Sequence, residues 1–97
     1  MTNWIIVYTT SAFECKWCIK MKELLNVYGF DFYEKDIHKE ERYKKEFLER
    51  GFKTVPQVFV ENALIGGYEN SKRYFRNRFL ENHPNRDKVI KELEGLE

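Results

Sequence analysis

The sequence predicts a small α/β domain in which short strands alternate with helices. Three observations support this prediction. The hydrophobic pattern switches repeatedly between short, β-rich apolar runs and the three-and-four spacing of amphipathic helices. At 97 residues, with 42% hydrophobic and 16% aromatic residues, the chain can build one core. Its only two cysteines, Cys15 and Cys18, lie between the first apolar run and the first helical pattern.

The first strand and the first helix flank these cysteines. Residues Ile5–Tyr8 form an apolar run, and because it is nearly continuous rather than alternating, we expect a central strand that is buried on both faces. After a loop, apolar side chains recur at helical spacing over residues 16–28, and Gly29 is placed to end that helix.

The middle of the chain predicts a second strand and a second helix. Residues 30–34 alternate in the manner of a strand. The highly charged stretch that follows carries one narrow apolar stripe before Gly51, so we expect a helix that is mostly solvated. The stripe consists of Tyr43, Phe47 and Leu48.

The next part of the chain predicts a hairpin and a third helix. A strand that includes Pro56 is expected over residues 54–60, and a turn at Glu61-Asn62 leads into a second strand over residues 63–65. Gly66-Gly67 break that strand before a helical pattern begins. The apolar positions of this pattern are Tyr74, Phe75 and Phe79.

A final segment from about Pro84 predicts a short extra helix packed on the body of the fold. Its apolar positions, at helical spacing, are Val89, Ile90 and Leu93. We therefore expect a single domain over residues 1–97, with a core of about 4–80 and a C-terminal helical extension over 81–97.

Charge and hydropathy exclude several classes of function. Seventeen basic and sixteen acidic residues leave a formal charge of +1, so no overall field favours nucleic acid or an anionic membrane. The N-terminal residues 1–8 carry no basic leader and only a brief apolar stretch, and nothing later in the chain approaches membrane-spanning length. We expect a cytoplasmic protein whose partners are neither nucleic acid nor membrane, and whose cysteines are oxidised only transiently.

The one local charge bias is the basic stretch over residues 72–91. Such a run usually forms a solvated helix face. A docking face for an acidic protein partner is the alternative that the sequence leaves open.

The spacing of the two cysteines indicates redox chemistry. A disulfide between Cys15 and Cys18 closes a tiny loop and removes little entropy from the unfolded chain, so the pair is interpreted as reactive rather than structural. Half a zinc site is an alternative, but zinc needs four ligands, and His38 and His83 do not fall at a recognised ligand spacing. We expect no metal, and we expect both histidines to be solvated loop residues.

The two cysteines have different expected roles. A free thiol has a pKa of about 8.5, and a helix N-terminus lowers it. Cys15, at the helix start, gains most and is the expected nucleophile, while Cys18, one turn further on, is expected to resolve the mixed disulfide. Glu14 disfavours the thiolate, whereas Lys16 and Lys20 favour it if their ammonium groups reach the sulfur.

Three motifs in register resemble a dithiol glutaredoxin over residues 4 to about 80. They are Cys15-X-X-Cys18, Thr54-Val55-Pro56 and Gly66-Gly67-Tyr68-Glu69. The resemblance implies a thioredoxin-like fold, with a four-stranded mixed sheet flanked by helices, and a disulfide oxidoreductase that uses glutathione as its reductant. The short chain is similar to small bacterial and phage-encoded members that supply electrons to ribonucleotide reductase. Disulfide-containing proteins are the implied substrates, and we expect a monomer.

The resemblance also implies a groove for glutathione. In glutaredoxins the proline that matches Pro56 follows a cis peptide bond, and the backbone at Val55 pairs with an extended peptide. Gly67 lets the backbone approach the ligand, and the helix start presents amides to the γ-glutamyl carboxylate. The implied binding residues are Lys16, Trp17, Thr54, Val55, Pro56, Gly67, Tyr68, Glu69 and Asn70.

The chain departs from the family pattern at the cysteine motif, in the loop before it and at the last motif, where Glu69 and Asn70 stand in place of the usual aspartate or serine. Lys16 and Trp17 replace the usual Pro-Tyr pair between the cysteines, so Trp17 is expected to wall the groove. Ala12 stands where the family commonly has a lysine, in a loop that is longer than in compact members. The anchor for the glycine carboxylate of glutathione is then left to another cation. The candidates are Arg42, Lys44 and Lys53.

Each motif also has an ordinary explanation when it is taken alone. Pro56 suits a turn or an edge strand, and Gly66-Gly67 suits a loop. Phe13, Trp17 and Tyr68 suit core packing or scattered surface aromatics, and only their position around the expected groove favours substrate contact. The register of the three motifs is what favours the functional interpretation.

Three hypotheses follow for the function. The first is a glutathione-linked dithiol oxidoreductase that reduces protein disulfides and mixed disulfides with glutathione. The second is a redoxin of the same fold that thioredoxin reductase recharges. The third is a carrier in which Cys15 of two chains and two glutathiones hold an iron-sulfur cluster; bulky Lys16 and Trp17 disfavour it.

Overall fold

The computed structural model describes residues 4–96 of the chain. Met1–Asn3, the first part of the segment that is predicted to carry no leader, therefore lie outside the described residues.

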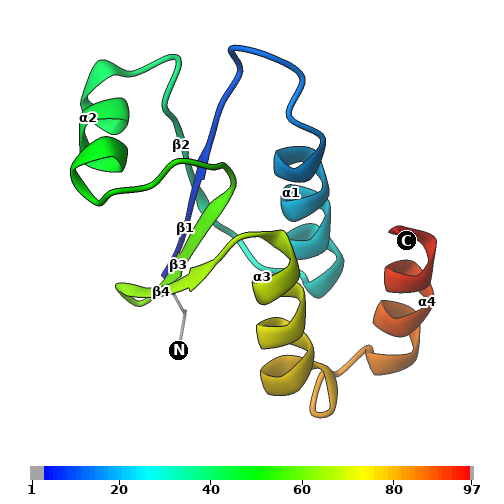
Figure 1. The fold of residues 1–97 in the computed structure, drawn as a ribbon. Helices are drawn as coiled ribbons and strands as arrows, with labels where there is room; N and C mark the ends of the chain where they lie inside the picture. The colour runs from blue at the N-terminus through cyan, green and yellow to red at the C-terminus, as the bar shows by residue number, and fades with distance from the viewer. Residues whose placement is uncertain (1–3, 97) are drawn as a thin grey trace.

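A four-stranded mixed sheet forms the centre of the fold (Figure 1). Its strands are β1 (Ile5–Thr9), β2 (Tyr33–Asp36), β3 (Gln57–Val60) and β4 (Ala63–Gly66). The spatial order is β2-β1-β3-β4, with β1 parallel to β2 and antiparallel to β3. This confirms the expected mixed sheet and the central position of the first strand. The β3–β4 hairpin turns through Glu61 and Asn62, which both have positive φ.

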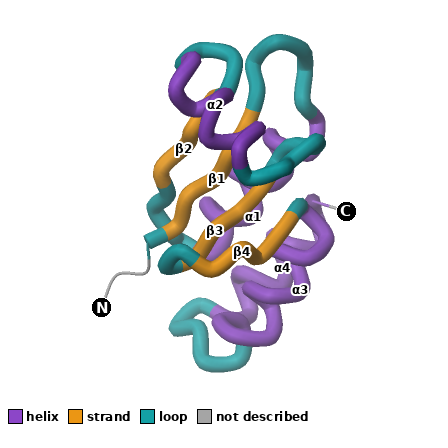
Figure 2. Tube along the Cα trace, turned by 60° about the vertical axis from the view of Figure 1, so that its left-hand side comes forward, coloured by secondary structure: helices purple, strands orange, loops and turns teal. Residues whose placement is uncertain are grey.

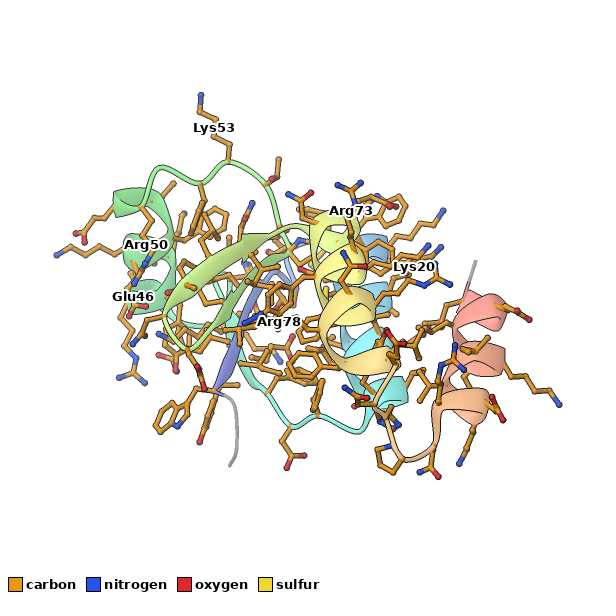
Figure 3. All side chains as sticks on the ribbon, turned by 90° about the horizontal axis from the view of Figure 1, so that it is seen from below. Lys20, Glu46, Arg50, Lys53, Arg73 and Arg78 are labelled. Atoms are coloured by element: carbon orange, nitrogen blue, oxygen red, sulfur yellow. A yellow bond between two sulfur atoms is a disulfide. The ribbon has the colours of Figure 1, made fainter. Side chains whose placement is uncertain are left out.

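Helices cover both faces of this sheet. They are α1 (Lys16–Tyr28), α2 (Glu41–Glu49), α3 (Tyr68–Phe75), a π-helical turn η1 (Arg76–Leu80) and α4 (Arg86–Leu96). Helices α1 and α3 lie on one face and α2 on the other, while α4 packs on the outside of α1 (Figures 1 and 2). Glu46 and Arg50 accordingly lie on one side of the molecule and Lys20 on the other (Figure 3).

The first strand is buried on both faces, as its apolar run predicts. Ile5 and Val7 join the larger core under α1 and α3, which also takes Val89 and Leu93 from α4. Tyr8 points to the smaller core under α2. Alternate side chains of a strand point to opposite faces, so β1 contributes to both cores at once.

The second strand begins later than predicted. The hydrogen-bonded ladder with β1 starts at Tyr33, opposite Ile6, so the predicted boundaries of 30–34 are wrong. Phe30 and Phe32 pack instead against the larger core, and the Phe30 N–H donates to the Leu25 carbonyl in the turn that ends α1. The aromatic alternation indicates a connection whose two half-buried rings pack on the core, rather than a paired strand.

The third strand also starts later, at Gln57 rather than at residue 54. Its ladder with β1 begins where Gln57 pairs with Tyr8. Pro56, the residue before, has no N–H to give to a ladder, so residues 54–56 lie outside the sheet. The Val55–Pro56 peptide bond is cis, as the resemblance implies.

The predicted helices form, with two differences in detail, and one predicted loop residue also differs. The third is α-helical only to Phe75 and continues as the π turn η1, which contains Phe79. Leu48 is exposed, so Phe47 is the residue of the α2 stripe that enters the core. His83 is not simply solvated, because its Nε2 lies 2.9 Å from the Tyr28 carbonyl and its Nδ1 accepts the Asn85 N–H.

Candidate active site

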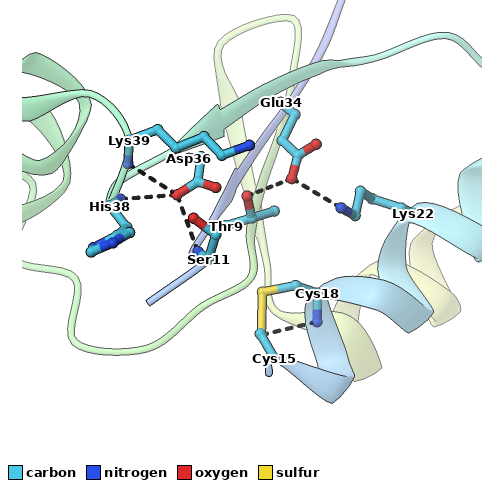
Figure 4. Close-up of polar contacts among 9 residues, drawn as sticks. All are labelled: Thr9, Ser11, Cys15, Cys18, Lys22, Glu34, Asp36, His38 and Lys39. Carbon is cyan, nitrogen blue, oxygen red and sulfur yellow. Dashed lines mark hydrogen bonds and ion pairs between the residues drawn. A yellow bond between two sulfur atoms is a disulfide. The ribbon is translucent and has the colours of Figure 1, made fainter. Parts of the chain in front are cut away.

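The two cysteines lie at the N-terminus of α1 and are joined by a disulfide (Figure 4). Cys15 has an extended backbone and is the N-cap residue of the helix, while Cys18 lies in its first turn. The Cys18 N–H donates to the Cys15 sulfur at 3.1 Å. Cys15 is 7% exposed and Cys18 only 2% exposed, so Cys15 is the more accessible residue of the pair.

This position gives the Cys15 sulfur a chemical advantage. An N-cap side chain accepts a hydrogen bond from one of the free amides of the first helical turn, and it faces the positive end of the helix dipole. The first turn of α1 contains no acidic residue that would oppose this effect. A thiolate at this place is therefore stabilised relative to an ordinary cysteine thiol.

The loop that leads to Cys15 is tied to the end of β2 by Asp36. One carboxylate oxygen accepts the Ser11 N–H at 3.1 Å and the N–H groups of His38 and Lys39 at 2.9 and 3.3 Å (Figure 4). Burial alone would raise the pKa of Asp36, but these N–H donors outweigh it and hold the pKa below its ordinary value. Asp36 thus remains ionised where it fixes the loop.

A second polar contact joins β1, β2 and α1 near the disulfide. The buried Thr9 hydroxyl donates to Glu34 at 2.7 Å, and the Lys22 ammonium group pairs with the same carboxylate oxygen at 3.0 Å (Figure 4). The end of β1, where the loop to Cys15 begins, is therefore held to both β2 and α1.

A cavity of about 390 Å³ lies against the start of α1. It is lined by Trp17 of α1, by residues 54–56 before β3, and by residues 67–70 at the start of α3. Eight of the nine residues that the sequence implied as binding residues are thus brought together in one groove. The Trp17 and Tyr68 rings are 5.4 Å apart, so the two aromatics form a continuous wall.

Lys16, the ninth residue, does not line this groove. Its ammonium nitrogen lies 5.5 Å from the centroid of the Trp17 ring, and that of Lys20 lies 5.2 Å from it. Both cations that the sequence set beside the cysteines therefore contact the aromatic wall.

The two glycines before α3 have different roles. Gly66 has a φ of +118°, and a Cβ there would come within 2.8 Å of the Asn70 side-chain nitrogen, so both conformation and space favour glycine. Gly67 is the N-cap of α3 with an ordinary negative φ, and a Cβ there would meet the Pro56 carbonyl at a normal 3.6 Å. The steric need for glycine is thus at Gly66 rather than at Gly67.

A second cavity, of about 300 Å³, adjoins the groove. Thr54 and Val55 line both cavities, and Lys53 and the exposed Phe13 line the second. Of the three candidate anchors for a carboxylate, Lys53 alone lines one of these two cavities. Arg42 contacts Glu40 and the Tyr43 ring instead, and Lys44 lines neither cavity.

Sequence reasoning missed several residues of this region. Asp36 holds the cysteine loop, and Ile37 and Phe47 line the second cavity. Asp36 is separated from Ser11 by 25 residues, and no local pattern at either position signals the contact. Only the parallel pairing of β1 with β2 brings them together.

Within residues 4–96, no three side chains of His, Cys, Asp or Glu gather in a way that could hold a metal ion. None of the helices in that range is both long and apolar enough to cross a membrane.

Comparison with known proteins identifies the fold and the family. Residues 5–65 match the glutaredoxin family profile. Glutaredoxin 1 of Rickettsia conorii is 36% identical over 87 residues, which cover 82% of this chain and 83% of that protein. The crystal structure of a buckwheat glutaredoxin–glutathione complex is similar in fold, with a TM-score of 0.65, 20% identity and coverage of 97% of this chain and 79% of that one.

A structure of the glutaredoxin-like protein NrdH-redoxin from Escherichia coli, described as having a thioredoxin-like activity profile, is also similar in fold. It has a TM-score of 0.62 and 22% identity, and the match covers 69% of this chain and 86% of that one. The expected thioredoxin-like fold is therefore confirmed. With a family profile that spans more than half of the sequence and a cysteine pair already joined by a disulfide, the chain belongs to the glutaredoxin family of thiol-disulfide oxidoreductases.

Proposed function

We propose that this protein uses glutathione to reduce protein disulfides and mixed disulfides between glutathione and protein thiols. The observation that carries the proposal is the groove at the start of α1, because Trp17, which lies between the two cysteines in the sequence, residues 54–56 and residues 67–70 line one cavity. The backbone at Val55 and the amides at the start of α3 are the groups that would hold the peptide and its γ-glutamyl carboxylate.

Cys15 is the nucleophile in the proposed reaction. Its thiolate attacks the glutathione sulfur of a mixed disulfide, the protein thiolate leaves and takes up a proton, and Cys15 is left bonded to glutathione. A second glutathione thiolate attacks the glutathione sulfur of that bond. This step releases oxidised glutathione and returns Cys15 to the thiolate. The N-cap position of the Cys15 sulfur supports this role.

Cys18 resolves the intermediate when the substrate is a protein disulfide. Cys15 then becomes bonded to one substrate sulfur, and Cys18 attacks the Cys15 sulfur, which expels the reduced substrate and forms the disulfide seen in the structure. Two glutathione molecules reduce this disulfide and become oxidised glutathione. Because Cys18 is one turn away and buried, it acts after Cys15 rather than in its place.

Lys53 is the proposed anchor for the glycine carboxylate of glutathione. It takes the place of the lysine that Ala12 replaces, and its position on the cavity next to Thr54 and Val55 supports it over Arg42 and Lys44. Lys53→Ala is expected to raise the KM for glutathione, with Lys44→Ala as the matched control.

The test compares two sources of electrons for the same protein. NADPH oxidation is followed with glutathione and glutathione reductase, and separately with thioredoxin reductase. The proposal expects turnover of a glutathionylated peptide only in the first system. Turnover only with thioredoxin reductase would refute it and would favour a redoxin with the activity profile described for NrdH-redoxin.

Two cysteine variants assign the roles. Cys15→Ser is expected to lower activity on every substrate by about a thousandfold or more, because it removes the nucleophile. Cys18→Ser is expected to retain turnover of the glutathionylated peptide and to lose reduction of protein disulfides. Full activity without Cys15 would exclude the mechanism.

The physiological setting is part of the proposal. We infer a monomeric, cytoplasmic enzyme, with ribonucleotide reductase as a candidate protein substrate. The charge bias over residues 72–91 offers exposed arginines on α3, η1 and α4 for docking an acidic partner. Ribonucleotide reductase turnover that depends on this protein and on glutathione would support the assignment.

A further inference from the structure

Lys20 connects the C-terminal helix to the groove. Its ammonium nitrogen donates to the Leu96 carbonyl oxygen at 3.4 Å and also lies 5.2 Å from the centroid of the Trp17 ring. The side chain is half-buried, and it lies on the side of α1 that faces α4 (Figure 3). One residue therefore contacts both the last turn of α4 and the aromatic wall of the groove.

The contact with α4 has an electrostatic reason. The last carbonyls of a helix lack intrahelical donors and form the negative end of its dipole, so a cation is favourable there. Helix α4 has no basic residue in its own last turn. Lys20 supplies the missing cation from α1, across a sequence separation of 76 residues.

The contact with Trp17 restrains a residue that is otherwise open to solvent. The Trp17 side chain is 45% exposed, and its ring contacts Tyr68 at 5.4 Å. Lys16 and Lys20 both lie over the ring, but Lys16 is exposed, whereas Lys20 is half-buried. Cation–π attraction is stronger for a partly desolvated cation, so Lys20 contributes more to holding the ring.

We propose that Lys20 is a positioning residue, through which the docking of α4 fixes the Trp17 ring and thereby the affinity of the groove for a glutathionyl group. This gives the C-terminal segment, whose role the sequence does not indicate, a function at the active site. The identity of the ligand rests on the function proposed above. The link between α4, Lys20 and Trp17 does not.

The experiment reads the two contacts of Lys20 with separate measurements, emission for the Trp17 ring and amide exchange for α4. All variants carry Trp4→Phe, which leaves Trp17 as the single tryptophan of the chain. Lys20→Met keeps the aliphatic stem and removes the charge, and Lys20→Arg restores the charge. Lys16→Met is the matched control, because it removes the other cation from the same ring. Three quantities are measured: steady-state kinetics with a glutathionylated peptide, the emission maximum of Trp17, and amide hydrogen exchange in the last turn of α4.

Lys20→Met is expected to raise the KM for the peptide about threefold with kcat unchanged, to shift the Trp17 emission, and to speed exchange in the last turn of α4. Lys20→Arg is expected to restore all three. Lys16→Met is expected to shift the emission and to leave exchange in α4 unchanged.

Two results would overturn the inference. Wild-type KM and emission in Lys20→Met would mean that Lys20 serves only the stability of α4. Unchanged exchange in α4 in Lys20→Met would mean that Lys20 acts only on the Trp17 ring and does not link it to the helix. If the wild-type protein has no glutathione-dependent turnover, the proposed function fails, whereas emission and exchange still decide whether Lys20 links α4 to Trp17.

Discussion

The face of the sheet under α1 and α3 has a large apolar core with one polar contact beside it, between Thr9, Glu34 and Lys22, whereas the smaller face under α2 places an ion pair directly against its aromatic rings. On the first face, Val7, Met21 and Phe75 are fully buried. The ring of Phe75 alone contacts four other aromatic rings, those of Tyr28, Phe30, Tyr74 and Phe79.

The second face is smaller and more polar. The Tyr8 hydroxyl donates to Glu46 at 2.8 Å, and the Lys35 ammonium group pairs with the same oxygen at 2.8 Å. The bond from Lys35 is the main cause that lowers the pKa of Glu46, and burial raises the pKa of Tyr8. Burial opposes the charge on Lys35, yet Glu46 outweighs this effect and raises its pKa.

The two faces of the sheet therefore support different parts of the molecule. The disulfide lies at the start of α1, and α1 and α3 supply Trp17 and residues 68–70 of the groove, on the side where apolar packing makes the main contribution. The side under α2 borders the second cavity and depends on a charged network. The packing under α1 and α3 should therefore be sensitive mainly to the loss of apolar side chains, and the packing under α2 also to the loss of charge.

The largest expected effect tests the two cores directly. Phe75→Ala should lower the free energy of unfolding by about 4 kcal/mol, and Phe47→Ala by about 3 kcal/mol. Phe75 is enclosed on all sides, whereas Phe47 lines the second cavity, which lets neighbours and water fill the space it leaves. Urea unfolding measures both values. Equal losses of stability would show that the two cores are equally well packed and would contradict the expected difference between them.

A smaller effect tests the charged network. Glu46→Gln should lower stability at pH 7 by about 0.5 to 1 kcal/mol, because the Glu46 side chain is 38% exposed and water screens its pair with Lys35. The pKa of Glu46 is lowered in the fold. The stabilisation that ionised Glu46 gives to the fold is thus fully present at pH values above its ordinary pKa of 4.5. It is lost as the pH falls through the lower pKa that Glu46 has in the folded protein.

Urea unfolding of wild type and variant at several pH values measures that difference. The matched control is Glu49→Gln, since Glu49 pairs with Lys45 at 4.0 Å on the exposed side of α2 and should contribute almost nothing. A Glu46 effect that persists at pH 2 would contradict the electrostatic explanation.

The smallest global effect concerns the loop that passes from the sheet to Cys15. Asp36→Ala should change overall stability by less than about 0.5 kcal/mol, because the loop is exposed. It should nevertheless speed amide exchange at Ser11, whose N–H the carboxylate accepts. Nuclear magnetic resonance measures this exchange residue by residue. Unchanged exchange at Ser11 would mean that the loop is held by other contacts.

The sequence predicts those parts of the molecule that depend on neighbouring residues. The periodicity over residues 16–28 reports one face of a helix, and α1 has these bounds. Cys15 precedes that pattern and is its cap. The family resemblance adds the grouping of residues 54–56 with residues 67–70, which no local pattern contains.

The remaining features depend on contacts between distant residues. Phe30 and Phe32 have the alternation of a strand, but the position of β1 decides where pairing begins. His83 meets Tyr28 at a separation of 55 residues, and Lys20 meets Leu96 at 76. Such contacts follow from how the helices pack, and a single sequence does not specify that packing beforehand.

The π turn η1 has a consequence for how the chain tolerates changes in length. A π turn is an α-helix that has gained one residue. Phe75 and Leu80, five positions apart, are both buried, while Asn77 and Arg78 between them are exposed. Deletion of Asn77 would bring the two buried residues to the four-residue spacing of an ordinary helix. Relatives that are one residue shorter here are therefore expected to have an unbroken helix, with α4 docked against α1 in the same place.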